Sequence, residues 1–339
     1  MTYTSGGLIQ ASDYNDFAGQ GATLLNTNNV NRVWGNGTAT FGYGQGGSTP
    51  IPAVVGGNTV VTASQWSTLN NIITSIASHQ GTAITSRANP VVGDTISVLA
   101  ALQNDITNIN LARGNSATLG SQYAIWTGPA SQTSGTGSGS SAWSLTWTQR
   151  INFPTAAQAN WFFNSGGLIK WQVNKTSTGT VADLAWNTFI NNGISDIFIT
   201  AGNQTQNIAG INYTGVTRVG GTIAPTTFLP TAGYYNLTST PQIIYQVFNN
   251  ISPYGGNNLR LIASMNGPVQ MLLTTVWSSS GGSGPGSTSA ITGGSDTPSP
   301  FVGFGTAPTT LVTYINPETV NLTNSWGTPT IAYDPISVA

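Results

Sequence analysis

Two kinds of hydrophobic periodicity divide this chain into an N-terminal third with helical spacing and a longer part with strand spacing. In the N-terminal third, apolar positions recur at intervals of three and four, which places them on one face of an α-helix. We predict three helices: one behind an N-cap at Ser12, one behind an N-cap at Ser64, and the strongest one starting near Asp94. Their helix faces consist of Tyr14, Phe17, Gly21 and Leu24; of Trp66, Leu69, Ile73 and Ile76; and of Leu99, Leu102, Ile106 and Ile109.

The first two helical segments resemble copies of one another. Residues 9–14 and 61–66 each hold an apolar residue, then Ala-Ser, then an aromatic residue, at an offset of 63 − 11 = 52 positions. Either a capped amphipathic helix is repeated, or the match arises by chance in a chain rich in serine and alanine. The glycine-rich segment 34–47 between them is predicted to be a loop. It has no following lysine and no preceding strand, so we do not assign it to phosphate binding.

Beyond about residue 120 the period of the pattern changes to two. Residues 142–148 alternate Trp143, Leu145 and Trp147 with Ser and Thr, which predicts a half-buried strand. Similar short runs, bounded by Gly, Pro, Asn or Ser, occur at 168–173, 196–200, 242–248, 259–263, 270–277 and 310–315. One predicted helix, 181–190, interrupts them.

These elements predict an α+β, mainly β protein with two domains. The first, residues 1–120, is an N-terminal helical region for docking or assembly, and the second, residues 121–339, is an antiparallel β-sandwich of jelly-roll-like type. Two segments have the Gly/Ser/Thr composition of flexible chain. We interpret 131–141 as a candidate linker between the domains, and 278–300 as a long exposed loop of the sandwich.

Charge is scarce along the whole sequence. Lys and Arg number 8 and Asp and Glu number 9, so that 5% of 339 residues are charged, against about 25% in an average soluble domain. Uncharged polar side chains therefore make most of the protein's contacts with water. Its stability should depend little on salt or pH. The net charge of −1 without a basic cluster argues against nucleic acid as a partner. Because no window of 18 apolar residues occurs, we also predict no membrane insertion.

The side chains that carry catalysis are equally scarce. His79 is the only histidine, Glu318 is the only glutamate, and there is no cysteine. Most nucleophile, general-base and metal-ligand arrangements therefore cannot be assembled. We interpret His79 as a residue at the end of the second helix, where it interacts favourably with the helix dipole. We predict no enzymatic activity, no catalytic residue, no metal site and no cofactor.

The carboxylates give little support for hydrolysis or metal binding. Asp183 and Asp196 are the only neighbouring pair in the strand domain, and glycoside cleavage needs two carboxylates held roughly 5 to 10 Å apart. Since Asp183 is typical of the first turn of a helix, we do not assign this pair to hydrolysis. Asp13 and Asp16 lie close together at a helix start, where the dipole favours carboxylates in any case.

Ten tryptophans raise the question of carbohydrate binding, because flat rings stack on sugar faces. Most should be core residues, since Trp143, Trp147, Trp161 and Trp171 fall at alternating or apolar positions. A carbohydrate-binding module without catalysis is the alternative from another functional class.

A family resemblance is carried by residues 153–171, in which Trp161, Phe162 and Phe163 precede Asn-Ser-Gly-Gly and a strand. This segment resembles one that recurs in virion structural and tail-fibre-like proteins of tailed bacteriophages, notably those infecting aquatic bacteria. Further similar segments are 8–15, 213–221 and 233–238. The resemblance implies a component of the virion, preferably a tail fibre or fibre-like appendage. A baseplate, neck or capsid-decoration component is the second choice.

The partners follow from the same resemblance. It implies that the protein contacts other virion proteins and forms a homo-oligomer, for which a trimer is favoured. It also implies contact with the host surface, where a glycan is the candidate ligand. The candidate assembly seam is Leu99, Leu102, Ile106 and Ile109. In the alternative, this helix face packs against the helix of Trp66–Ile76 inside one subunit. The candidate core anchors are Trp161, Phe162 and Phe163.

Overall fold

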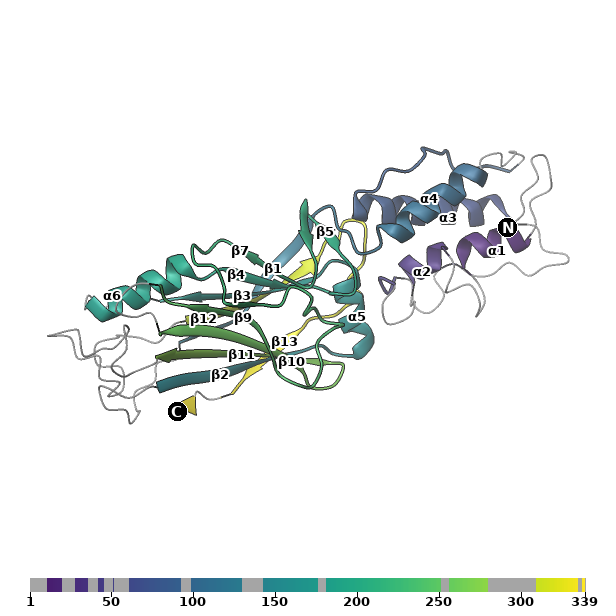
Figure 1. The fold of residues 1–339 in the computed structure, drawn as a ribbon. Coiled ribbons are helices and arrows are strands. Elements are labelled where there is room, and N and C mark those ends of the chain that lie inside the picture. The colour runs from purple at the N-terminus through teal and green to yellow at the C-terminus, as the bar shows by residue number, and fades with distance from the viewer. Residues whose placement is uncertain are drawn as a thin grey trace.

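A computed structural model gives the fold of the chain. It describes residues 11–19, 28–35, 42–45, 51, 61–92, 99–129, 143–175, 181–250, 256–279, 309–334 and 337–338. The first four helices gather at the N-terminal end of the molecule, and the strands together with two further helices form the rest, as Figure 1 shows. The protein is mainly antiparallel β with a few helices, which confirms the predicted class.

The N-terminal helices are α1 (Ala11–Ala18), α2 (Val30–Trp34), α3 (Ala63–Gln80) and α4 (Leu99–Leu111). Helix α3 is the longest of the four, and both of its ends are capped. Thr62, and not the predicted Ser64, is the N-cap, and its hydroxyl accepts from the Gln65 backbone while the Gln65 side chain accepts from the Thr62 backbone. At the other end, Gly81 takes the left-handed conformation with φ 70° and stops the helix.

Helix α1 differs from its prediction at both ends. It begins at Ala11, so Ser12 lies inside the first turn, and it ends at Ala18 before Gly21 and Leu24, which fall outside the described residues. The two similar segments nevertheless start their helices at equivalent positions, Ala11 and Ala63. Their aromatic residues meet: Tyr14 and Trp66 pack edge to face with ring centroids 5.4 Å apart.

The strand region contains two large sheets and one small one. The first sheet has the order β1-β12-β3-β4-β7, and the second has the order β13-β2-β11-β10-β9-β8, with β14 also paired to β2. Strands β5 and β6 form a separate hairpin. The strands of the first sheet are β1 (Leu119–Pro129), β3 (Leu168–Asn174), β4 (Asp196–Ile199), β7 (Val216–Val219) and β12 (Thr309–Pro317). Those of the second are β2 (Trp143–Asn152), β8 (Thr227–Phe228), β9 (Gln242–Phe248), β10 (Asn258–Met265), β11 (Gln270–Ser279), β13 (Thr330–Tyr333) and β14 (Ser337–Val338), and the hairpin is β5 (Gln206–Ile208) with β6 (Ile211–Tyr213).

The two large sheets face each other across a shared apolar interior. Each sheet sends one tryptophan to a threonine of the other: Trp147 Nε1 on β2 donates to Thr310 Oγ1 on β12, and Trp171 Nε1 on β3 donates to Thr275 Oγ1 on β11, both at 3.0 Å. These bonds satisfy indole N–H groups that would otherwise be buried without a partner. The inward positions of β2 are those that the alternation predicted, since Leu145 and Trp147 are buried, whereas the Trp143 side chain lies outside the described part.

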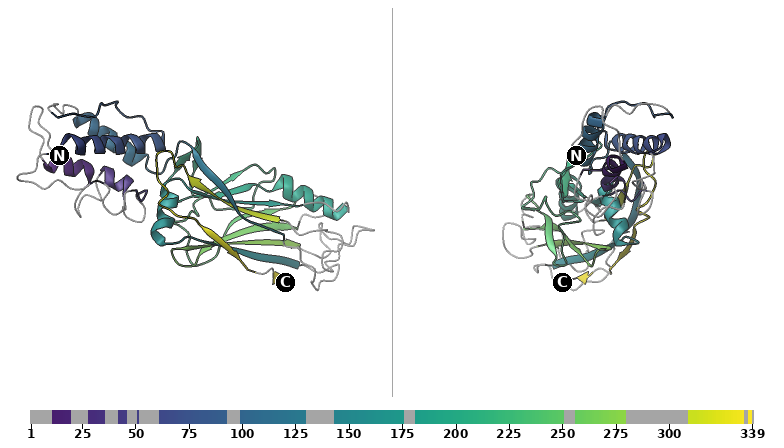
Figure 2. Two further views of the ribbon diagram at one scale, coloured as in Figure 1. Left: turned by 180° about the vertical axis from the view of Figure 1, so that it is seen from behind. Right: turned by 90° about the vertical axis from the view of Figure 1, so that its right-hand side faces the viewer.

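Two further helices lie within the strand region, at opposite ends of it (Figures 1 and 2). The first, α5 (Ala156–Asn164), faces the N-terminal helices, and α6 (Val181–Thr188) lies at the far end and continues into a π-helical turn at Phe189–Gly193. Helix α6 and its extension match the predicted helix 181–190, whereas α5 was not predicted.

The two Gly/Ser-rich segments, 131–141 and 278–300, lie almost wholly outside the described residues. Their positions between elements are nevertheless defined. The first falls between β1 and β2, two strands of different sheets, so it does not separate the helices from the strands. The change from helices to strands occurs earlier in the sequence, between the end of α4 at Leu111 and the start of β1 at Leu119. The second falls between β11 and β12, as expected for a loop of the strand region.

Candidate functional site

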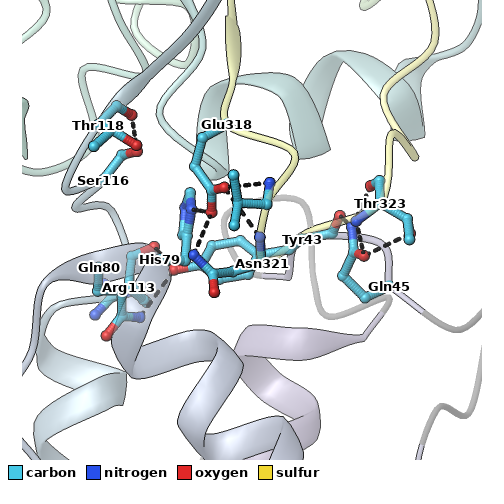
Figure 3. A network of polar contacts seen from close by, with 11 residues as sticks. Tyr43, Gln45, His79, Gln80, Arg113, Ser116, Thr118, Glu318, Asn321 and Thr323 are labelled. Carbon is cyan, nitrogen blue, oxygen red and sulfur yellow. Dashed lines mark hydrogen bonds and ion pairs between the residues drawn. The ribbon is translucent and has the colours of Figure 1, made fainter.

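The most highly connected polar site lies where the helices meet the strands. Five segments converge there: the turn 42–45, the C-terminal end of α3, the end of α4 with Arg113, helix α5, and the segment 318–327 that follows β12 (Figure 3). A single cluster of buried apolar side chains continues from the helices into the space between the sheets. We call this region the junction.

A buried pair of side chains forms the centre of the junction. His79, in the last turn of α3, places its Nδ1 atom 2.8 Å from Oε1 of Glu318, which directly follows the last residue of β12. Both residues are buried, with 0% and 4% of their surface exposed. The chain's only histidine thus contacts its only glutamate across 239 positions of sequence.

Hydrogen bonds to the Glu318 carboxylate favour its ionised form. Besides His79, its oxygens accept from the backbone N–H of Val320 at 2.6 Å, the backbone N–H of Asn321 at 3.0 Å and the Asn321 side-chain amide at 3.2 Å. Burial alone would raise the pKa of Glu318, but the hydrogen bonds from His79, Asn321 and Val320 outweigh it and lower the pKa to about 2. An ionised acceptor requires His79 Nδ1 to carry the hydrogen.

The other ring nitrogen of His79 has a different environment. Among the described residues, Nε2 has no hydrogen-bond partner, and the ring packs edge to face on Tyr43 with centroids 5.1 Å apart. The imidazole is therefore held by one polar contact and one aromatic contact. With no exposed surface, it is placed to hold two parts of the chain together and not to exchange protons with a substrate.

A second chain of hydrogen bonds links α3 to α4 through the tyrosine beneath the histidine. Gln80 Nε2 donates to Tyr43 Oη and to the Ile109 carbonyl, both at 2.9 Å, and Tyr43 Oη donates to the Arg113 carbonyl at 2.9 Å. Burial raises the pKa of Tyr43 well above its usual value, so the phenol stays a neutral donor. These bonds satisfy backbone carbonyls near the end of α4 that have no helical partner.

Gln45 connects the turn 42–45 to the segment after β12. Its Nε2 donates to the Thr323 carbonyl at 2.8 Å, and its Oε1 accepts from both the backbone N–H of Thr323 at 2.8 Å and the Thr323 hydroxyl at 2.7 Å. Ser325 Oγ donates to the Tyr43 carbonyl at 2.6 Å. Gln45 is 1% exposed, so its amide contacts replace those that water would otherwise make.

Helix α5 completes the junction from the strand side. The indole of Trp161 lies against Gly44, where a Cβ atom would come within 2.3 Å of the ring. Gly44 also has φ +71°, so both the backbone and the space require glycine. Asn164 Nδ2 donates to the Gly42 carbonyl at 3.2 Å, and Asn164 Oδ1 accepts from the Tyr235 hydroxyl at 3.0 Å.

The three predicted core anchors occupy two different positions. Phe162 and Phe163 are fully buried and pack edge to face with centroids 5.0 Å apart, and both contact Phe153. Trp161 is only partly buried, and its ring lies against Gly44 at the junction.

The predicted assembly seam lies inside the subunit. Leu102, Ile106 and Ile109 are 3%, 0% and 0% exposed and belong to the apolar cluster that α4 shares with α2 and α3. This is the packing of the alternative interpretation, in which the face needs no second copy. Leu99 begins α4, and its side chain lies outside the described part. A homo-oligomer would have to form through other surfaces.

Asp196, from the carboxylate pair considered for hydrolysis, has two polar partners. Asp196 accepts from Gln172 Nε2 at 2.8 Å and pairs with Lys170 Nζ at 2.9 Å, and the side chain of Asp183 is not described. Across the described ranges, no three His, Cys, Asp or Glu side chains come together as a metal site would need. Of the tryptophans whose side chains are described, six are buried, and Trp34 and Trp161 are partly buried.

The junction itself was missed by the sequence analysis. His79 was assigned only to a helix end, and Glu318 was given no partner. One signal was present: in a chain with a single histidine and a single glutamate, each next to the end of a predicted element, a buried pair between them is a natural choice.

Comparison with known protein families, with curated proteins and with solved structures finds no match for this chain. In the part of the chain that the structure describes, no helix is both long enough and apolar enough to cross a membrane.

Proposed function

We propose that this chain is a non-enzymatic structural protein of a tailed-phage virion, preferably a tail fibre or fibre-like appendage. The observation that carries the proposal is the junction, where a helical region and a strand region share one buried core and a set of hydrogen bonds. A particle component must transmit load between the end that docks and the end that faces outward. A junction held by a shared apolar core and by hydrogen bonds suits that task.

Composition supports the same role. A virion protein persists outside the cell, and this chain has no cysteine with which to form a disulfide. Its durability would come from packing and from uncharged hydrogen bonds, which neither titrate nor respond to salt as ion pairs do. The resemblance of residues 153–171 to virion structural proteins points in the same direction.

The arrangement of the strands supports a β-sandwich as the outward part, since the two sheets exchange Trp–Thr hydrogen bonds across their interior. We propose that the sandwich faces outward and that the helical end docks on other virion proteins. The strand order adds no support for the jelly-roll-like subtype of the sandwich. A glycan of the host surface stays the candidate ligand of the outward part.

The test is the composition of the particle. Gradient-purified virions of the phage that encodes this chain should contain it at a fixed copy number by quantitative mass spectrometry. Immunogold labelling should then place it on the tail, as opposed to the neck or capsid. Recovery of the chain only from the soluble fraction of the lysate would overturn the proposal.

A second measurement addresses catalysis. Incubation of the purified protein with host-surface polysaccharide should release no reducing ends. Release that is abolished by Asp183→Asn or Asp196→Asn would show an enzyme instead.

A further inference from the structure

One border of the first sheet differs from the other borders in length and in charge. Strand β1 hydrogen-bonds only to β12, so its second edge has no ladder among the described residues. It runs for 11 residues. The other borders of the two large sheets are β7 with 4 residues, β13 with 4, β14 with 2 and β8 with 2.

Exposed strand edges are templates for pairing with another chain, and proteins usually protect them by shortness, charge or covering. The border β7 is short and carries the exposed Arg218 at its third position, and β8 and β13 are short. By contrast, residues 119–129 contain no Asp, Glu, Lys or Arg, and their only proline is the last residue. Two register shifts, between Leu119 and Gln122 and between Ala124 and Trp126, interrupt this edge and give β1 some protection.

The open edge is accessible where its side chains are described. Ser121 and Gln122 are exposed, and Tyr123 keeps 45% of its surface. Strand β13 of the second sheet approaches β1, but its ladder is with β2 and it forms none with β1.

We propose that the β1 edge binds the β1 edge of a second copy of this chain, antiparallel and about a two-fold axis. Every ladder between the named strands is antiparallel, so the same geometry extends the first sheet across the axis. A two-fold arrangement satisfies both open edges at once and closes the assembly.

The chemistry of β1 also favours a second copy over a foreign partner. Two identical uncharged strands meet without like-charge repulsion, whereas β1 carries no charge that would select a complementary foreign sequence. The inference concerns self-association and holds whether or not the virion role is correct.

Charge substitutions on the edge test the proposal. The full chain should be a dimer by native mass spectrometry and by light scattering at tens of micromolar. The variant Ser121→Lys/Gln122→Lys and the variant Ser121→Glu/Gln122→Glu should each raise the dimer Kd at least tenfold, because each dimer then carries four like charges on its paired edges. An equal mixture of the two should restore dimers of mixed mass. Val219→Lys, at an exposed position of the opposite border β7, is the matched control and should leave the dimer unchanged.

Melting curves by circular dichroism separate loss of the dimer from misfolding. Because Ser121 and Gln122 are exposed, substitutions there should leave the melting temperature near that of the wild type. If a variant does not fold, hydrogen exchange of the wild type decides: the amides of residues 119–129 should gain protection as concentration rises. A wild-type monomer, a trimer, a dimer that both charge variants leave intact, or protection independent of concentration would overturn the proposal.

Discussion

The Nδ1 atom of His79 lies 2.8 Å from Oε1 of Glu318, and this contact joins the last turn of α3 to the segment that follows β12. In the folded chain the Glu318 carboxylate receives four hydrogen bonds, which favour its ionised form over its neutral form. The pair therefore links the stability of the junction to the ionisation of one residue.

We predict that Glu318→Gln lowers stability and removes part of its acid dependence. The pKa of Glu318 is about 2 in the folded protein and about 4.3 in an unfolded chain. Its contribution is therefore complete above about pH 4.3 and is lost as the pH falls toward 2. At neutral pH the variant should lose about 1–3 kcal/mol, since an amide leaves donors in the junction unsatisfied. Melting temperatures between pH 2 and 6 measure both effects, through the difference between variant and wild type.

The matched control is Asp334→Asn, which breaks the pair of Asp334 with Arg150, whose side chains are 41% and 36% exposed. Loss of this exposed pair should have little effect on stability, because water and salt screen the two charges. If Glu318→Gln and Asp334→Asn behaved alike, the junction pair would have no special role.

Gly44→Ala should destabilise the protein more than Gly267→Ala. Both glycines have φ +71°, so alanine carries the same backbone cost of roughly 1–2 kcal/mol at each. At Gly267 a Cβ meets nothing within 4 Å, but at Gly44 it would overlap the Trp161 ring. Overpacking should add about 1–3 kcal/mol at Gly44. In a Trp161→Ala background the extra cost should vanish, and a denaturant double-mutant cycle that showed no coupling would contradict the contact.

Truncation of the α5 aromatics tests the core. Phe162→Ala and Phe163→Ala should each cost about 3–5 kcal/mol, since both rings are fully buried. Phe248→Ala, at a ring with 36% exposure, should cost clearly less. Urea unfolding curves compare the three variants. Wild-type stability in either of the first two would remove that phenylalanine from the core.

On α4, Leu102→Asp should unfold the helical region, whereas Leu111→Asp should be tolerated. The first side chain is 3% exposed and the second is 72% exposed, and burial of an unpaired carboxylate is strongly unfavourable. Helical circular dichroism and limited proteolysis report the outcome. A folded Leu102→Asp monomer derived from an oligomeric wild type would restore the α4 face as an assembly seam.

Salt should have little effect on the melting temperature. Among the described residues, ion pairs number four, and two of these, Arg87–Asp105 and His79–Glu318, are buried. Raising NaCl from 0.1 to about 1 M shortens the Debye length from about 10 to about 3 Å and screens only the exposed pairs. A change of a few degrees at most is expected, and stability should also be nearly constant between about pH 5 and 9. A steep decline with NaCl would reveal further charge pairs.

The sequence predicted those elements whose burial is periodic. The alternation along β2 and the three-and-four spacing of α3 and α4 match the buried positions because each element presents one face to the core. Helix α5 was missed because Trp161, Phe162 and Phe163 are consecutive and show no period. Its capping signal was present, since the Thr155 hydroxyl accepts from the Gln158 backbone, in the same spacing as Thr62 and Gln65.

Strand β1 and the junction could not be predicted in this way. Residues 119–129 show no clear alternation, as expected for a border strand with two register shifts. The junction depends on partners 239 and 278 positions apart, such as His79 with Glu318 and Gln45 with Thr323. No local pattern encodes such pairs. Only the small number of ionisable residues made one of them foreseeable.

The segment 318–327 also sets an order of events during synthesis. The N-terminal helices leave the ribosome before the strands, but their contacts with Glu318, Thr323 and Ser325 become possible only when β12 and the segment after it have been made. Until then His79 and Gln45 lack their final partners, and the helices depend on their own apolar packing. A protein truncated before residue 318 would therefore keep its helices and most of its strands, but it would lack the last connection between them. Closure of the junction thus comes after synthesis of the two large sheets up to β12.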